Sequence, residues 1–250
     1  MPRIRLYSDQ EMQSGSLLKL TGPPAHHLLK VLRRRVGDHL VVFNGNGEDH
    51  FGEITSIDGR DNCSIQLLET RRPPTESPLK VTLIQAIGRG DRMDWALQKS
   101  VELGVHQIQP IMSERTEVRL TGARAEKRQS HWQKVVISAC EQSGRVRIPQ
   151  VNSVVQLIDL TPPAGIGLFL DPDAEQTLAD LDIGAAKASE ATAEQSMALA
   201  VGPEGGFSEL EIKQLSTLGF TGLRLGPRVL RTETAGPAAL AILQSHFGDC

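Results

Sequence analysis

Three short loops in the second half of the sequence combine glycine, proline and charged residues in a pattern that favours ligand binding. Each loop follows an apolar run typical of a buried strand, and the three runs end at Leu170, Val201 and Leu225. Ligands in open α/β sheets bind beyond the carboxyl ends of the strands, and glycine lets them approach the backbone closely. One such loop alone is more simply a tight turn, which is the usual meaning of Gly-Pro. Three similar loops together predict a ligand site.

The charges of these loops indicate what kind of ligand the site would hold. Gly202-Pro203-Glu204 places a carboxylate where a bound phosphate would sit, so a positively charged group such as a sulfonium or an amine fits better. The chain has no Walker A motif, and Gly88-Arg89-Gly90 lacks the third glycine of a dinucleotide-binding loop. Scattered histidines and the widely spaced Cys63, Cys140 and Cys250 predict neither a metal site nor a disulfide framework.

The densest group of polar residues lies in the run 225–235. One interpretation is a helix N-terminus, with Thr232 or Thr234 as the N-cap and the glutamate between them complementing the helix dipole. That interpretation does not explain why Arg228 and Arg231 lie beside a Gly-Pro turn. Guanidinium groups in such a place are suited to a phosphate or to the carbonyl of a base.

The scaffold for these loops is an alternation of strand and helix patterns after residue 78. A capping box at Ser208 and Glu211 predicts the start of one helix. The alternation implies an α/β domain with a largely parallel sheet. Strands are expected at 79–86, 166–170, 197–201 and 222–225, and helices with apolar stripes at 93–101, 132–139 and 235–243.

The first part of the chain is predicted to be a separate domain rich in β-structure. The proline-rich segment 71–78 opposes both helix and central strand and indicates a linker. Before it, an apolar run at 40–43, a turn at 44–47 and an alternating run at 51–57 suggest a small β-barrel of about 70 residues. A helix is expected near 24–34. The predicted domains are therefore residues 1–72 and 78–250.

The distribution of charge favours a polyanionic partner although the net charge is −3. Seven acidic residues and one lysine lie between Asp171 and Glu194, and the rest of the chain is basic. Charge runs are usually solvated faces, but several basic residues are candidates for contact with RNA. They are Arg3, Arg5, Lys30, Arg33, Arg34, Arg145 and Arg228.

Other features of the chain bear on where it acts. The sequence contains no apolar run long enough to span a membrane, and its first residues do not resemble a signal peptide. A cytoplasmic protein is therefore expected. The acidic segment 174–196 is expected to form a short helix and a loop.

Long stretches of the sequence resemble the ribosomal small-subunit RNA uridine-N3 methyltransferases, the RsmE family within the SPOUT superfamily. The strongest similarity lies in Gly202–Ser208 and Leu225–Ala235. Supporting stretches are His27–Arg33, Lys99–Val105, Trp132–Lys134 and Glu141–Arg145. Several motifs in the right order along nearly the whole chain make this resemblance specific.

The resemblance implies both the architecture and the reaction. It implies a PUA-like β-barrel, a SPOUT α/β domain whose C-terminal part forms a deep trefoil knot, and a homodimer. The cofactor would be S-adenosylmethionine, and the product N3-methyluridine in the decoding region of 16S rRNA, within the assembled 30S subunit. On matching positions, the cofactor-binding residues are Leu170, Val201, Gly202, Pro203, Glu204, Gly205, Leu225, Gly226, Pro227 and Leu230.

This reaction would need a proton acceptor and a group that stabilises an anion, because uracil N3 carries a proton at neutral pH. Arg231 is the candidate for stabilising the anion, and Glu233 or Glu204 is the candidate acceptor. The sequence does not choose between the two glutamates. Two alternatives are a catalytically silent RNA-binding assembly factor and a methyltransferase for another RNA base. A Rossmann-type oxidoreductase is disfavoured by the missing dinucleotide fingerprint.

Overall fold

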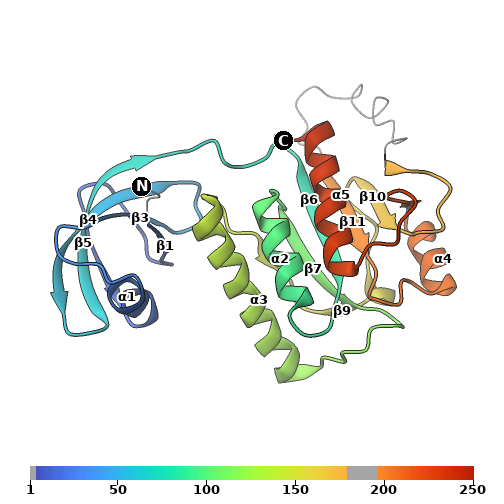
Figure 1. The fold of residues 1–250 in the computed structure, drawn as a ribbon, viewed down its shortest axis with the longest axis horizontal. Coiled ribbons are helices and arrows are strands. Elements are labelled where there is room, and N and C mark those ends of the chain that lie inside the picture. The colour runs from blue at the N-terminus through green and yellow to red at the C-terminus, as the bar shows by residue number, and fades with distance from the viewer. Residues whose placement is uncertain (1–3, 179–195) are drawn as a thin grey trace. The chain divides into compact units, whose positions relative to one another are not determined.

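The computed structural model describes residues 4–178 and 196–250, which fall into two compact units (Figure 1). The first unit consists of Met1–Glu76 and Cys140–Ile148, and the second of Ser77–Ala139 and Pro149–Cys250. Most of the segment 174–196, for which a short helix and a loop were expected, lies outside the described residues. None of the described helices is long and apolar enough to cross a membrane.

The first unit is built on a five-stranded sheet with the order β1-β3-β4-β5-β2. Neighbouring strands pair antiparallel, except β1 and β3, which pair parallel. Apolar residues on one side of the sheet and under a short helix form its core. The elements are β1 (Arg5–Tyr7), β2 (Leu17–Thr21), α1 (Pro23–His26), the π-helical turn η1 (His27–Val31), β3 (His39–Phe43), β4 (Asp49–Asp58) and β5 (Asn62–Arg71).

The long hairpin of β4 and β5 gives this sheet its curl. Its register shifts between Phe51 and Gly52 and again between Ile54 and Ser56, and such irregularities bend strands. A Cβ atom at Gly52 would lie 2.6 Å from Ile65 Cγ2, so only glycine fits at the first shift. The strands predicted at 40–43 and 51–57 are confirmed by β3 and β4.

The helix predicted near 24–34 is shorter than expected. It consists of α1 and η1 and ends at Val31. Arg33 then adopts a φ of 52°, the only positive φ of a non-glycine residue among those described. A left-handed residue cannot continue a right-handed helix, so the chain turns away before the predicted end.

The second unit contains a seven-stranded sheet, in which all paired strands are parallel. The order is β12-β10-β11-β6-β7-β8, and β9 also pairs with β7. The strands are β6 (Lys80–Ala86), β7 (Gln107–Met112), β8 (Gln150–Val151), β9 (Val155–Gln156), β10 (Ile166–Leu170), β11 (Ser196–Val201) and β12 (Phe220–Leu223). The helices are α2 (Arg92–Glu102), α3 (Gly122–Ser143, whose last four residues belong to the first unit), the 3-10 turn η2 (Leu157–Asp159), α4 (Glu209–Thr217) and α5 (Thr232–Phe247).

Helices cover both faces of the central strands. Ala198 and Ala200 of β11 belong to the core cluster that contains Phe207 and Leu215, beside α4. On the alternate face, a Cβ atom at Gly236 of α5 would lie 3.6 Å from Val201 Cγ2, so glycine lets α5 lie close to the sheet. Helix α5 also packs beside α2, as Figure 1 shows.

The strand order brings the ends of β10, β11 and β12 together. β10 lies between the other two, and β12 forms the edge of the sheet. The segment after β10 pairs with the end of β12, because Asp171 N donates to Leu223 O at 3.0 Å and Arg224 N to Gln176 O at 2.9 Å. From the edge, the chain returns to α5, which packs against β6 and β11. The predicted fold class is confirmed in its curled β-sheet and its parallel α/β sheet, whereas the knot stays a prediction.

Candidate active site

The three loops predicted to form a ligand site line one cavity of about 730 Å³ in the second unit. Their positions follow from the sheet, because parallel neighbouring strands deliver their carboxyl ends to the same edge. The volume lies within the range of small-molecule sites, which is roughly 300–1,000 Å³. All the predicted cofactor residues except Pro227 line the cavity. Their contact with a cofactor stays a prediction.

The loop after β11 is closely packed and anchored at its far end. A Cβ atom at Gly202 would lie 3.2 Å from both Gly206 C and Phe207 N, so a side chain there would press on backbone. Gly206 N donates to Pro203 O at 2.9 Å and closes the turn. Phe207 is buried in the core, and the capping box predicted at the next residue is present at the start of α4. The loop therefore has little freedom to move.

The loop after β12 leads into α5 in a way that the sequence did not predict. The N-cap of α5 is Arg231, which makes no side-chain capping bond, and not Thr232 or Thr234. The Thr232 hydroxyl instead donates to the Gly202 carbonyl at 2.6 Å. The same hydroxyl accepts from Gln85 Nε2 at 3.0 Å, and not from a backbone N–H of the first turn, so the predicted cap is wrong.

The carboxylate of Glu204 is held by donors from the start of α2 and the loop before it. Its Oε1 accepts from the Arg89 backbone N–H at 3.2 Å and from Arg92 Nη1 at 2.7 Å. Burial raises the pKa of Glu204, but hydrogen bonds from its own N–H, from Arg89 N–H and from the Arg92 guanidinium together lower it. A carboxylate stabilised in its charged form is a weak proton acceptor.

Glu233 lies at the start of α5, outside the set of residues that line the cavity. Its side chain is 14% exposed, and its Oε1 is 3.9 Å from Arg92 Nε. Its Oε2 is buried and has no hydrogen-bond partner among the described residues. Arg92 therefore faces both candidate proton acceptors, and Glu233 is the one with an unused oxygen.

Arginines surround the cavity, and two of them were not predicted. Arg228 and Arg231 line it as expected, and both are exposed. Arg92 and Arg115 line it as well, and Arg115 Nη1 donates to the Gly205 carbonyl at 2.7 Å. Nothing in the local sequence marks these two, because they lie on α2 and after β7 and reach the site only through the fold.

The basic residues predicted to contact RNA in the first unit divide into two groups. Lys30, Arg33 and Arg34 are exposed on and after η1. Arg5 is mostly buried, forms an ion pair with Asp49 and stacks over the Phe43 ring, 4.6 Å from its centroid. Arg3 lies outside the described residues.

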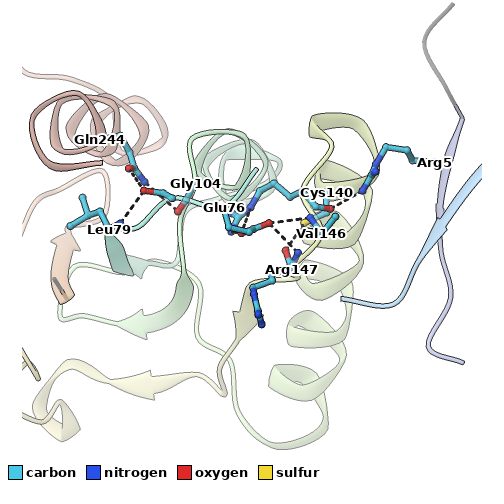
Figure 2. A network of polar contacts seen from close by, with 10 residues as sticks. Arg5, Glu76, Leu79, Gly104, Cys140, Val146, Arg147 and Gln244 are labelled. Carbon is cyan, nitrogen blue, oxygen red and sulfur yellow. Dashed lines mark hydrogen bonds and ion pairs between the residues drawn. The ribbon is translucent and has the colours of Figure 1, made fainter. Parts of the chain in front are cut away.

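Arg145 is buried and belongs to a polar network around Glu76 in the first unit; Figure 2 labels Glu76, Val146, Arg147 and Arg5 of this network. Its Nη2 donates to Glu76 Oε2 at 2.7 Å, while Glu76 Oε1 accepts from the backbone N–H groups of Val146 and Arg147, both at 3.0 Å. Arg5 Nη2 donates to the Arg145 carbonyl at 3.0 Å. Contact of Arg5 and Arg145 with RNA stays a prediction that this geometry does not favour. No cluster of potential metal ligands occurs in the part of the chain that the structure describes.

Comparison with known proteins points to one family. The family model for an RNA methyltransferase domain matches residues 75–244. The family model for an RNA methyltransferase PUA domain matches residues 20–68. The chain is 34% identical to ribosomal RNA small subunit methyltransferase E of Buchnera aphidicola subsp. Schizaphis graminum, over 98% of this chain and 97% of that protein. It is 29% identical to the Bacillus subtilis protein of the same name, over 94% and 92%.

Solved structures agree with these relatives. Ribosomal RNA small subunit methyltransferase E from Neisseria gonorrhoeae, bound to S-adenosyl methionine, is 38% identical to this chain, with a TM-score of 0.87 and 99% of both chains covered. A Legionella pneumophila protein in complex with bound SAM is 37% identical, with a TM-score of 0.91 and 100% of both chains covered.

Proposed function

This chain belongs to the ribosomal RNA small subunit methyltransferase E family, and we propose that it transfers a methyl group from S-adenosylmethionine to N3 of a uridine in 16S rRNA. The cavity formed by the loops after β10, β11 and β12 is the observation that carries the proposal. The glycines and charges of the sequence predict a ligand site at the same three loops. We place the target uridine in the decoding region, as the resemblance implies.

The residues of the cavity fit this cofactor. Gly202 lines the cavity and carries no side chain, which supports a loop whose backbone faces the ligand. Carboxylates of Asp171, Asp173 and Glu204 line the cavity and suit a sulfonium and an amino group. The guanidinium groups around it suit the carboxylate of a methionine moiety. We propose the predicted cofactor residues, from Leu170 to Leu230, as its contacts.

The cofactor supplies an electrophilic methyl group, and the chain must prepare the nucleophile. The uracil N3–H bond must break, N3 must bond to the methyl carbon as that carbon's bond to sulfur breaks and leaves a neutral thioether, and a base must keep the proton. We propose that Arg231 stabilises the uracil anion through a base carbonyl. Glu233 is better supported than Glu204 as the acceptor, because its Oε2 has no partner among the described residues whereas Glu204 is held as an anion by Arg92. Since Glu233 lies outside the cavity lining, the proton would reach it through water.

We propose that the two predicted domains have separate functions. Residues 1–72 would bind RNA as a PUA-like domain, and residues 78–250 would carry the methyl transfer. Exposed Lys30, Arg33 and Arg34 are the RNA contacts in the first, and Arg228 lies at the cavity in the second. The resemblance further supports a C-terminal trefoil knot, a homodimer, the 30S subunit as substrate and a cytoplasmic location.

Three matched variants test the proposed chemistry. Arg231→Ala and Glu233→Gln should each lower kcat on small-subunit rRNA by at least about tenfold. Glu204→Gln keeps the shape of the side chain and should lower kcat less than Glu233→Gln. Calorimetry with S-adenosylmethionine would show that each variant still binds it. Full turnover by Glu233→Gln together with loss of turnover by Glu204→Gln would reverse the assignment of the base.

A further inference from the structure

A buried chain of hydrogen bonds connects the central strand β6 with two of the loops that line the cavity. Gln85, at the carboxyl end of β6, is 1% exposed and donates from Nε2 to Thr232 Oγ1 at 3.0 Å and to the Ala86 carbonyl at 3.1 Å. The Thr232 hydroxyl donates in turn to the Gly202 carbonyl at 2.6 Å. The chain of bonds therefore runs from β6 through the first residue of α5 to the loop after β11.

The chemistry of these groups allows only one direction for the bonds. The carbonyls of Ala86 and Gly202 accept and cannot donate, so the amide nitrogen of Gln85 must face Ala86. The Thr232 hydroxyl has one proton, which goes to Gly202, and it accepts from Gln85. Thr232 is itself 6% exposed, so water does not compete freely for its hydroxyl. A buried chain with a single direction holds its members in one arrangement.

The position of Thr232 in the sequence connects it with the proposed chemistry. It lies between Arg231 and Glu233, the residues proposed to act on the base, while Gly202 begins a loop that lines the cavity. A threonine at the start of a helix commonly caps it, yet this hydroxyl bonds Gly202 and α5 begins without a side-chain cap. The hydroxyl accepts its hydrogen bond from Gln85 rather than from a backbone N–H of the helix.

We propose that Thr232 is a positioning residue, whose hydroxyl, oriented by Gln85, couples the Gly202 loop to the helix start that carries Arg231 and Glu233. This inference rests on the proposed function, because it assigns the loop to the cofactor and the helix start to the base. Group transfer is sensitive to small errors of alignment, so loss of the coupling should slow the reaction as well as weaken cofactor binding.

The test is a set of threonine variants with a control elsewhere. Thr232→Val keeps the shape and removes the hydroxyl, whereas Thr232→Ser keeps the hydroxyl. Thr232→Val should raise the Kd for S-adenosylmethionine about tenfold and lower kcat at saturating cofactor and RNA by about tenfold. Thr232→Ser should restore both. Thr217→Val removes a like bond, from Oγ1 to the Lys213 carbonyl at 2.8 Å in α4, and should change neither.

A purely structural role for Thr232 would give a different result. Thr232→Val would then lower Tm but leave kcat and the Kd for S-adenosylmethionine of the folded protein unchanged, which overturns the inference. Gln85→Met removes the amide that orients the Thr232 hydroxyl. It therefore tests the same coupling if Thr232→Val does not fold. The double variant should be little worse than Thr232→Val alone, since both act on one chain of bonds. Fully additive losses would contradict the coupling.

Failure of the proposed function can be told apart from failure of this inference. If the wild-type protein methylates no ribosomal RNA, the proposed function fails, whatever the variants do. Calorimetry and amide hydrogen exchange still test the coupling, because neither needs turnover. Faster exchange over residues 202–207 in Thr232→Val, reversed in Thr232→Ser, supports it. Unchanged exchange and unchanged cofactor affinity overturn it.

Discussion

Replacing Gly202 by alanine should weaken cofactor binding because the loop after β11 has no room for a methyl group. The added Cβ would lie 3.2 Å from Gly206 C and from Phe207 N, and 3.3 Å from Gly206 Cα. Carbon atoms prefer separations of about 3.5–4.0 Å, so the backbone must move by a few tenths of an ångström. The loop cannot yield easily, because Gly206 N is bonded to Pro203 O and Phe207 is buried.

The size of the effect follows from this crowding. Overpacking by one methyl group typically costs about 1–3 kcal/mol. If the strain is relieved by moving Gly202 toward the cavity, the Kd for S-adenosylmethionine rises roughly 5- to 150-fold. Calorimetry at 25 °C measures this directly. Thermal unfolding of the free protein, monitored separately, shows how much of the strain appears as lost stability.

Gly205→Ala is the matched control, because it lies in the same loop but meets a different neighbour. Its Cβ would lie 3.3 Å from Arg115 Cδ and 3.4 Å from Arg115 Cβ, within a flexible side chain that can move aside. We expect its affinity to fall less than that of Gly202→Ala. Gly202→Ala binding within twofold of the wild-type protein, or more tightly than Gly205→Ala, would refute the reasoning.

Three further predictions concern charge and reactivity. Glu204→Gln should lower Tm at pH 7, because the ionised carboxylate of Glu204 stabilises the folded protein. The difference in Tm from wild type should shrink below pH 4.5 and vanish once the pH falls below the lowered pKa of Glu204. A difference in Tm that does not change with pH would contradict this. Burial raises the pKa of Cys140 to about 12, so mass spectrometry after iodoacetamide at pH 8 should find exposed Cys250 alkylated and Cys140 intact in the folded protein. Arg145→Ala should destabilise the protein by about 2 kcal/mol, because half-buried Glu76 loses its charged partner and keeps only the backbone N–H groups of Val146 and Arg147, whereas Lys30→Ala should leave Tm unchanged and weaken RNA binding. Thermal unfolding and RNA titration test this pair. If Arg145 served mainly to bind RNA, Arg145→Ala would weaken RNA binding and leave Tm unchanged.

The site was predictable from the sequence where its signal is local. Glycine and proline after apolar runs marked the loops at Gly202 and Gly226, and parallel pairing explains why both reach one cavity. The capping box at Ser208 was equally visible, because its two partners are three residues apart. Arg92 and Gln85 could not be found in this way, since α2 and β6 reach the loops only through the order of the strands.

The sequence was least informative where a residue has a distant partner. Arg5 and Arg145 resemble surface arginines in sequence, but their acidic partners are 44 and 69 residues away. Thr232 has the sequence signal of an N-cap, yet its hydroxyl bonds a carbonyl 30 residues away. In each case tertiary packing replaced the local or solvated arrangement that the residue type favours.

Methyl transfer to ribosomal subunits tests the central claim most directly. Small subunits from cells that lack this enzyme would be incubated with the protein and S-adenosylmethionine labelled in its methyl group, then digested and mapped by mass spectrometry. The proposed function predicts label in 3-methyluridine at a single site of 16S rRNA. Label in another nucleoside would contradict the assigned chemistry, and cofactor binding without any label on ribosomal RNA would contradict the assigned substrate.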